Sequence, residues 1–394
     1  VLQDVCGNTY DNRFYPTFSG VARSINFYPV YPEKADEGIV DIALGLGKLI
    51  VDGGKTLRFS PKYPAKILQL SSPESALRDT QKEFYALDLD PGKFVPSINE
   101  DVNIVKLKIS DAEKDGVIKF VGSTYDFENN IIRDSTMYDG TKIITFASIL
   151  KHNTFPLSEI LNDIMEIGKK EMNNHIEVEF AVNFPKENKG EIIFYLLQIR
   201  PVIETEQDSG VSISHVVPED VVLFTESALG NGVFKNIKDI VYVKTEKFSS
   251  MNNIKIVDKI DALNNELTKE NRNFILIGPG RWGSSDNALG IPVKWSNISG
   301  ARVIVESGLS EYRIDPSQGT HFFHNLTSFR VAYFTINPFI HEGLYDVDYL
   351  DSLEAVYEDE YIRHVRFSND LRVEVDGKTG RGVVYKYDDL HSQE

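Results

Sequence analysis

Apolar and polar residues alternate along residues 176 to 184, and this period of two predicts a half-buried β-strand. Residues 191 to 199 predict a second strand, and the stretch between the two, from Pro185 to Gly190, is rich in turn-forming residues. The pattern therefore predicts a β-hairpin. Its second strand leads into Gln198, Ile199, Arg200 and Pro201.

A helix is predicted directly before this hairpin. Apolar residues recur at helical spacing over residues 157 to 174, with Ser158 as the predicted N-cap. Beyond the hairpin, residues 204 to 220 are polar and turn-forming, which predicts a domain boundary. We expect one domain over residues 1–208 and another over residues 209–394.

The second half of the chain alternates short apolar runs with turns. Residues 274 to 277 and 303 to 306 are predicted strands, and residues 371 to 375 and 382 to 387 predict a hairpin around Asp376 and Gly377. Residues 345 to 360 are acidic and predict a solvated helix or loop. Helices and strands in both halves indicate an α+β, mixed α/β, fold class.

The predicted hairpin carries candidate chemistry. Pairing its strands brings Glu177 and Glu179 next to Gln198 and Arg200. Carboxylate and amide oxygens are hard ligands that suit Mg²⁺, and a guanidinium group binds phosphate with two parallel hydrogen bonds. The arrangement predicts a site for a magnesium-bound nucleoside triphosphate. The alternative is that these acidic residues form only the solvated face of a strand.

Two segments, in the expected order, resemble the ATP-grasp domain of phosphoenolpyruvate synthase and pyruvate phosphate dikinase. Residues 176 to 181 and 196 to 201 resemble its closing strands, whereas residues 19 to 26 and 42 to 53 resemble its Ser-Gly-Val strand and glycine-rich segment. The resemblance covers about residues 1 to 205. It implies that Mg²⁺ and ATP are the cofactors: Glu177, Glu179 and Gln198 would hold the metal, and Glu179, Gln198 and Arg200 would bind the nucleotide.

The chain departs from the family pattern at two positions. Lys48 stands where the family has a glutamate, and Ile25 stands where it has an arginine. An ammonium group in place of a carboxylate inverts the local charge. Lys48 is therefore a candidate phosphate ligand, and the alternative is a site that has lost its activity. The glycines of this segment, such as Gly45 and Gly47, equally suit tight turns without any ligand.

The resemblance also implies that Val1 lies in the middle of an ATP-grasp domain. In that family the preceding lobe supplies a phosphate-binding lysine and arginine. We therefore expect the remaining lobe, an N-terminal part of the same polypeptide, to be a partner of these residues.

Residues 319 to 323 resemble the start of the phosphohistidine helix in the swivelling domain of the same enzymes. The resemblance implies a swivelling, phosphohistidine-like β/β/α domain after the ATP-grasp part, with His321 as the phosphoryl acceptor. A neutral imidazole is a suitable nucleophile near pH 7, and helix N-termini bind phosphate. Two alternatives stay open: a hydrogen-bonded core histidine among phenylalanines, and a metal ligand together with His324.

A glycine-rich loop follows one predicted strand of the second half. Residues 278 to 283 fit the pattern G-x-G-x-x-G, but residues 284 to 292 do not predict the helix that a dinucleotide site requires. We therefore reject a dinucleotide site. Arg281 in this loop is a candidate phosphate ligand for catalysis, and the alternative is an exposed turn.

Composition narrows the class of protein. The formal net charge of −17 argues against nucleic acid or an anionic membrane as the main partner. A single cysteine, Cys6, excludes an internal disulfide framework, and no apolar run is long enough to cross a membrane. We expect a cytoplasmic protein.

These observations together predict an ATP-dependent phosphotransferase of the dikinase type. ATP would be one substrate and a small molecule, with pyruvate as a candidate, would be the acceptor. The alternatives are a nucleotide-binding regulatory or scaffolding module without turnover, and a dikinase that acts on a glycan or another polymer.

Overall fold

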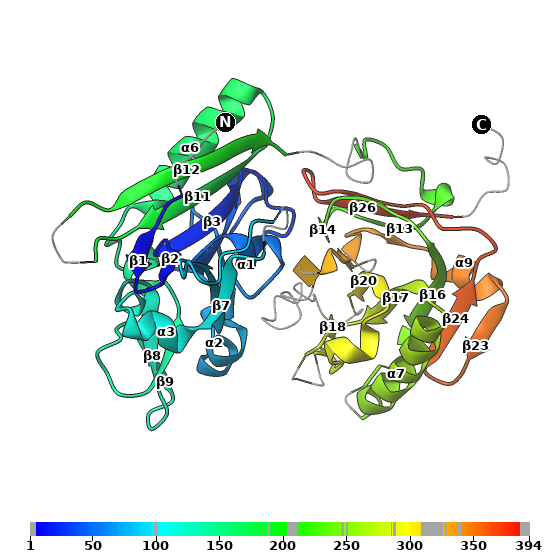
Figure 1. Cartoon of the computed structure of the whole chain (residues 1–394). Coiled ribbons are helices and arrows are strands. Elements are labelled where there is room, and N and C mark those ends of the chain that lie inside the picture. The colour runs from blue at the N-terminus through cyan, green and yellow to red at the C-terminus, as the bar shows by residue number, and fades with distance from the viewer. Residues whose placement is uncertain are drawn as a thin grey trace. The chain divides into compact units, whose positions relative to one another are not determined.

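The computed structural model describes residues 5–97, 101–186, 190–202, 211–245, 248–249, 251–284, 286, 289–308, 326–327, 329–337 and 340–386. The chain divides into two compact units (Figure 1). Unit 1 comprises Val1–Asn26 and Tyr31–Ile203, and unit 2 comprises Phe27–Val30 and Glu204–Glu394. Helices and strands occur in both units, which confirms the mixed α/β fold class. The expected boundary between residues 208 and 209 lies outside the described residues.

An antiparallel five-stranded sheet forms the centre of unit 1, and it contains the predicted hairpin. Its strands follow the order β12 (Ile193–Pro201), β11 (Ile176–Asn183), β3 (Phe18–Arg23), β4 (Ile39–Leu44) and β5 (Leu57–Phe59). The predicted strands at residues 176 to 184 and 191 to 199 are thus confirmed as β11 and β12.

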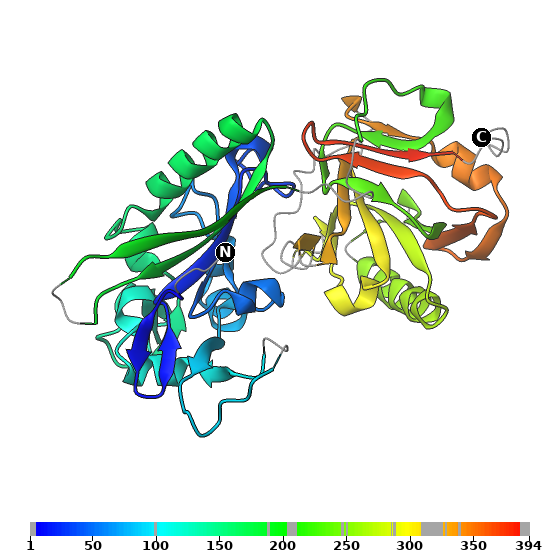
Figure 2. The same cartoon turned by 45° about the horizontal axis from the view of Figure 1, so that its top comes forward.

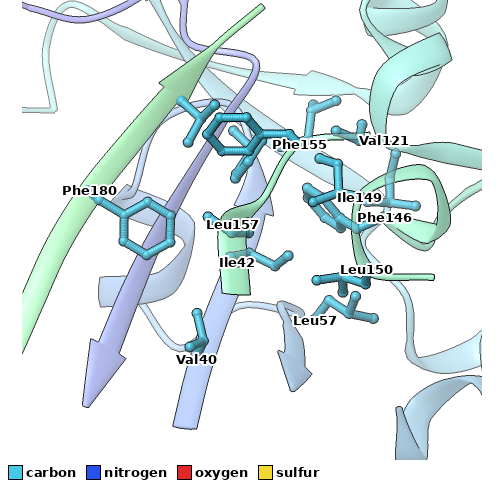
Figure 3. Close-up of a cluster of buried hydrophobic side chains, with 14 of the residues drawn as sticks. Val40, Ile42, Leu57, Val121, Phe146, Ile149, Leu150, Phe155, Leu157 and Phe180 are labelled. Carbon is cyan, nitrogen blue, oxygen red and sulfur yellow. The ribbon is translucent and has the colours of Figure 1, made fainter. Parts of the chain in front are cut away.

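The long helix α6 (Leu157–Met172) covers one face of this sheet (Figures 1 and 2). Alternate residues of β11, among them Val178 and Phe180, are buried and pack with Leu157 of α6. Figure 3 shows this core, in which Phe180 faces Leu157 and the sheet residues Val40 and Ile42. Because side chains alternate along a strand, the other residues of β11 lie on the opposite face, where the candidate site forms.

The helix is confirmed, but its predicted N-cap is wrong. Pro156 occupies the cap position without a side-chain hydrogen bond, and Ser158 lies inside the first turn. Leu157 is 1% exposed in the core. Because Leu157 is packed in the core, the helix begins at Leu157, one residue before Ser158.

Two smaller sheets and several short helices complete unit 1. The four-stranded sheet contains β1 (Asn8–Tyr10), β2 (Arg13–Tyr15), β6 (Glu83–Asp88) and β7 (Ile104–Lys108). The three-stranded sheet contains β10 (Thr141–Ile144), β8 (Gly122–Asp126) and β9 (Ile131–Arg133). The helices besides α6 are η1 (Ala35–Glu37), α1 (Lys48–Val51), η2 (Leu68–Leu70), α2 (Pro73–Asp79), α3 (Ile109–Lys114), α4 (Ile118–Val121) and α5 (Ala147–Leu150).

Unit 2 is built around a mixed seven-stranded sheet. Its strand order is β14 (Ala228–Leu229), β21 (Ala332–Ile336), β20 (Ala301–Ser307), β17 (Asn273–Pro279), β16 (Ile237–Val243), β24 (Ile362–Arg366) and β23 (Ala355–Glu358). The four strands β16, β17, β20 and β21 are mutually parallel. The predicted strands at residues 274 to 277 and 303 to 306 are confirmed as β17 and β20.

Both faces of this sheet are buried, so unit 2 has three layers. Ile275 and Ile277 of β17 face a five-stranded sheet, whereas Phe274 and Leu276 face helix α7 (Asn253–Lys269). Figure 1 shows α7 and the five-stranded sheet on opposite faces. The layers follow the expected β/β/α order. The five-stranded sheet contains β15 (Gly232–Phe234), β25 (Val373–Asp376), β26 (Arg381–Tyr385), β13 (Val221–Thr225) and β22 (Leu344–Tyr345).

The C-terminal expectations hold in part. The hairpin around Asp376 and Gly377 is confirmed as β25 and β26. The solvated helix or loop expected at residues 345 to 360 is wrong in part: α9 (Val347–Ser352) buries Leu350 completely, and β23 follows it. Further elements in the described part of unit 2 include η3 (Pro218–Asp220), β18 (Arg281–Trp282), β19 (Gly290–Ile291) and η5 (Trp295–Ile298).

Candidate nucleotide site

The sheet register brings four of the predicted site residues together in unit 1. Glu177 lies opposite Arg200 and Glu179 lies opposite Gln198 across β11 and β12. On the other side of β11, Glu177 lies opposite Arg23 of β3. Residues that face each other across strands, and residues two apart along one strand, share a face. Five side chains therefore lie on the sheet face opposite the core.

A β-bulge occurs at this point. The register shifts between Glu179 and Phe180, so that these residues pair with Gln198 and Leu196, and Leu197 is the extra residue. Bulges redirect side chains and are frequent beside active sites. The bulge was not predicted, because residues 192 to 197 are all apolar or aromatic and give no signal for a shift of register.

Glu179 and Gln198 line a pocket of about 620 Å³. Ser19 of β3 and Gly47, from the glycine-rich segment after β4, form another part of its wall. Further lining residues include Cys6, Leu46, Ala181 and Leu197. The structure thus joins the two segments that carried the family resemblance, although more than a hundred residues separate them along the chain.

The glycine-rich segment is fixed to the sheet beside this pocket. Ser19 Oγ donates a hydrogen bond to the carbonyl oxygen of Gly45 at 2.8 Å. Gly45 has a φ of 86°, and a Cβ atom there would lie 2.8 Å from the carbonyl oxygen of Tyr85. Only glycine fits this backbone without strain. Gly45 is therefore needed for the turn itself, in agreement with the alternative that these glycines serve tight turns. The turn places Gly47 in the wall of the pocket.

Glu177 is the most enclosed charged residue of the site. Its side chain is 10% exposed, and both carboxylate oxygens accept hydrogen bonds from arginine. Arg23 Nε lies 2.5 Å from Oε2, and Arg200 binds Oε1 through its Nε at 3.0 Å and through a terminal nitrogen. Burial alone would raise the pKa of Glu177, but the hydrogen bond from Arg200 and the charge of Arg23 outweigh it and lower the pKa.

Glu179 is in a different environment from Glu177. Its side chain is 35% exposed, and one of its oxygens lies 4.0 Å from a terminal nitrogen of Arg200. Gln198 is exposed and faces the same pocket. One carboxylate and one amide oxygen, with water completing the coordination, are donors that suit Mg²⁺. The residues of the pocket therefore fit a magnesium ion. Among the described residues, no cluster of three or more His, Cys, Asp and Glu side chains forms a ready-made metal site.

Lys48 follows Gly47 but directs its charge elsewhere. Its ammonium nitrogen lies 3.0 Å from Asp52 and 2.8 Å from Asp101. These hydrogen bonds, that from Asp101 first, raise the pKa of Lys48 well above its ordinary value. The lysine would have to exchange these carboxylates for phosphate before it could bind a nucleotide.

The family model for the pyruvate phosphate dikinase AMP/ATP-binding domain matches residues 2–220. The chain belongs to the pyruvate phosphate dikinase family. The match covers more than half of the chain and includes the whole pocket. No curated protein matches the sequence.

Family membership makes the pocket part of an ATP- or AMP-binding domain of kinase-like, phosphotransferase character. No role for Arg23 was predicted from the sequence. The available signal was its position, because Arg23 lies two residues after Val21 and four after Ser19, on the same face of β3 as the pocket-lining Ser19. None of the helices among the described residues is long and apolar enough to cross a membrane.

The remaining candidates lie in unit 2, beyond the matched residues. Arg281 belongs to the short strand β18, directly after β17. Its neighbour Trp282 is fully buried: the backbone N–H donates to Glu306 at 2.9 Å, and the indole N–H donates to the carbonyl oxygen of Val305. The loop is therefore anchored to β20. Residues 283, 284, 286 and 289–292, which the structure describes, contain no helix, in agreement with the rejection of a dinucleotide site. His321 and His324 lie outside the described residues.

Proposed function

We propose that unit 1 binds Mg-ATP for an ATP-dependent phosphotransferase of the dikinase type, resembling phosphoenolpyruvate synthase. One observation supports this proposal above the others. The pocket of about 620 Å³ joins Glu179 and Gln198 of the hairpin to Ser19 and to Gly47 of the glycine-rich segment. A concave site with a few converging polar groups is typical of ligand binding.

In this proposal each polar group of the site has a distinct task. Glu179 and Gln198 hold the magnesium ion, and the family resemblance suggests Glu177 as a further ligand. The bound ion supplies positive charge to the phosphate chain. Arg200 contributes a guanidinium group to the phosphates, and Lys48 contributes a second charge once it leaves its aspartates. Phosphoryl transfer depends mainly on such positioning and charge neutralisation.

The later steps rest on unit 2 and on the family resemblance. His321 accepts the phosphoryl group from ATP, and Arg281 stabilises the phosphate during the transfer. A small molecule, with pyruvate as the leading candidate, is the final acceptor. The remaining lobe of the nucleotide site comes from another part of the same polypeptide, as the resemblance implies.

The test uses the intact natural polypeptide that contains these residues. The protein is incubated with Mg²⁺ and ATP labelled on the β-phosphate, and peptides are analysed under alkaline conditions, because phosphohistidine survives them. We expect the label on the peptide that contains His321. His321→Asn should abolish labelling, whereas His324→Asn, the matched control three residues away, should retain it.

A second comparison separates the two functions under consideration. Glu179→Gln should weaken both ATP binding and labelling, whereas Glu166→Gln, on the exposed side of α6, should change neither. ATP binding that depends on Glu179 but yields no phosphohistidine would contradict the dikinase proposal. That result would favour the alternative, a nucleotide-binding regulatory or scaffolding module.

A further inference from the structure

Two arginines from different strands share one buried carboxylate on the sheet face that carries the pocket-lining Glu179. Arg23 comes from β3 and Arg200 from β12, and both bind Glu177 on the strand between them. The guanidinium-bearing side chains remain 43% and 48% exposed, whereas Glu177 is 10% exposed. The carboxylate is therefore the enclosed partner, and the arginines face solvent.

Each arginine keeps donors for a further ligand. A guanidinium group has five N–H donors. Among the described residues, Arg23 donates only through Nε, to Glu177, so its four terminal donors remain available. Arg200 uses its Nε and one terminal nitrogen on Glu177. With the second arginine, the three side chains carry a net charge of +1, and Glu177 lies two residues along β11 from the pocket-lining Glu179.

Magnesium binding at Glu177 conflicts with this arrangement. Both oxygens of Glu177 already accept arginine hydrogen bonds, and a divalent cation there would meet two guanidinium charges at close range. An ion at Glu177 would have to displace these enclosed bonds. Glu179 meets no such obstacle, because its arginine contact is 4.0 Å long and its side chain is more exposed.

We propose that Glu177 is a positioning residue, not a magnesium ligand, and that it holds Arg23 and Arg200 as a pair that binds the polyphosphate tail of the nucleotide. Arg23 is thereby a second phosphate-binding arginine of the site. This assignment rests on the proposed binding of ATP in unit 1, and it replaces the metal role that the family resemblance suggested for Glu177.

The test measures nucleotide affinity and magnesium dependence in the intact polypeptide. Calorimetry with ATP and with AMP is performed on the wild type and on Arg23→Gln, Arg23→Lys, Glu177→Gln and Glu179→Gln. Arg133→Gln is the matched control, since Arg133 pairs with Asp126 in the three-stranded sheet, outside the pocket. Thermal unfolding of each variant verifies the fold.

We expect Arg23→Gln and Glu177→Gln each to weaken ATP binding by about tenfold and AMP binding by less, because charged hydrogen bonds to the phosphate tail are lost. Arg23→Lys keeps the positive charge but not the parallel N–H donors of the guanidinium group. It should therefore lose less ATP affinity than Arg23→Gln. A double variant that combines Arg23→Gln with Glu177→Gln should bind ATP about as well as either single variant, since the two residues act as one unit. The magnesium concentration needed for half-maximal binding should rise in Glu179→Gln and stay unchanged in Glu177→Gln.

Three results would overturn the assignment. A magnesium requirement that rises in Glu177→Gln as much as in Glu179→Gln would make Glu177 a metal ligand. ATP affinity in Arg23→Gln equal to that of Arg133→Gln would remove Arg23 from the site. A wild-type protein that binds no nucleotide at all would overturn the proposed function as well, whereas the first two results would leave it standing.

Discussion

Each unit contains a buried carboxylate that binds two arginines, and the two clusters differ in what their arginines can still do. In unit 1, Glu177 binds Arg23 and Arg200. In unit 2, Asp239 of β16 is 1% exposed; Arg366 Nε donates to its Oδ1 at 2.6 Å, and Arg272 lies 3.2 Å from its Oδ2. In both clusters burial would raise the pKa of the carboxyl group, and hydrogen bonds with nearby positive charge lower it instead.

The arginines of the Asp239 cluster bind a second carboxylate, and we call this the closed cluster. The arginines of the Glu177 cluster do not bind a second carboxylate among the described residues, and we call this the open cluster. His364, which is 2% exposed, also donates to Asp239 at 2.8 Å. A second carboxylate, Glu270, binds both arginines from the other side. The arginines of Glu177 have no such second carboxylate within hydrogen-bonding distance among the described residues. A lowered carboxyl pKa therefore does not identify a functional site by itself. The two clusters differ instead in the arginine donors that remain available among the described residues.

The first prediction concerns the closed cluster and has the largest expected effect. Asp239→Ala should lower the free energy of unfolding of unit 2 by about 3–5 kcal/mol, because it removes the buried carboxylate that binds the buried His364 and two half-buried arginines. A loss of that size lowers the unfolding midpoint by about 10 °C for a domain of this length. Circular dichroism during heating measures the shift.

Glu270→Ala is the control for this prediction. Glu270 binds the same arginines but is 46% exposed, so its loss should change stability by less than about 1 kcal/mol. Equal destabilisation by the two substitutions would contradict the view that burial makes Asp239 the structural centre of the cluster.

The second prediction applies the same substitution to the open cluster. Glu177→Ala should destabilise unit 1 by only about 1–2 kcal/mol, since Arg23 and Arg200 can be hydrated once their partner is gone. Chemical denaturation of the two alanine variants compares the clusters directly. Glu179→Ala, at a half-buried position of the same strand without a close ion pair among the described residues, should leave stability unchanged. If Glu177→Ala lowered the free energy of unfolding as much as Asp239→Ala does, the proposed difference between the two clusters would be wrong.

The third prediction uses pH. The pKa values of Glu177 and Asp239 are lower in the folded than in the unfolded protein, so their stabilisation is complete above the ordinary carboxyl pKa of about 4 and is lost as the pH falls below it. The stability difference between the wild type and Asp239→Asn should therefore shrink from pH 6 to pH 3. Denaturation curves at each pH measure it, and a difference that stays constant would contradict the assigned pKa direction.

The sequence predicted the elements of the site better than its detailed geometry. Strict alternation over residues 176 to 184 predicted β11, and the pairing of Glu179 with Gln198 followed from the predicted hairpin. The contact between Glu177 and Arg23 could not be predicted in this way. It joins strands that are about 150 residues apart, and only the order β12-β11-β3 of the sheet makes them neighbours.

Hydrogen-bond competition explains why Lys48 was also difficult to assign. Its position after Gly47 predicted a charge directed at the nucleotide, but the structure shows its ammonium group between Asp52 and Asp101. Asp101 is 53 residues further along the chain. Local sequence patterns carry no information about such a distant partner.

Lys48 supplies the last prediction and the smallest expected effect. Lys48→Met should weaken ATP binding by no more than about threefold, because the lysine must first leave two carboxylates and its charge is exposed to solvent screening. Raising the salt concentration should reduce even this difference. Asp101→Asn should act in the opposite direction and strengthen binding slightly, since it releases the ammonium group. Calorimetry at two salt concentrations measures both variants. A loss in Lys48→Met as large as that in Arg23→Gln would mean that the lysine, and not the arginine pair, provides the main charge for the phosphates.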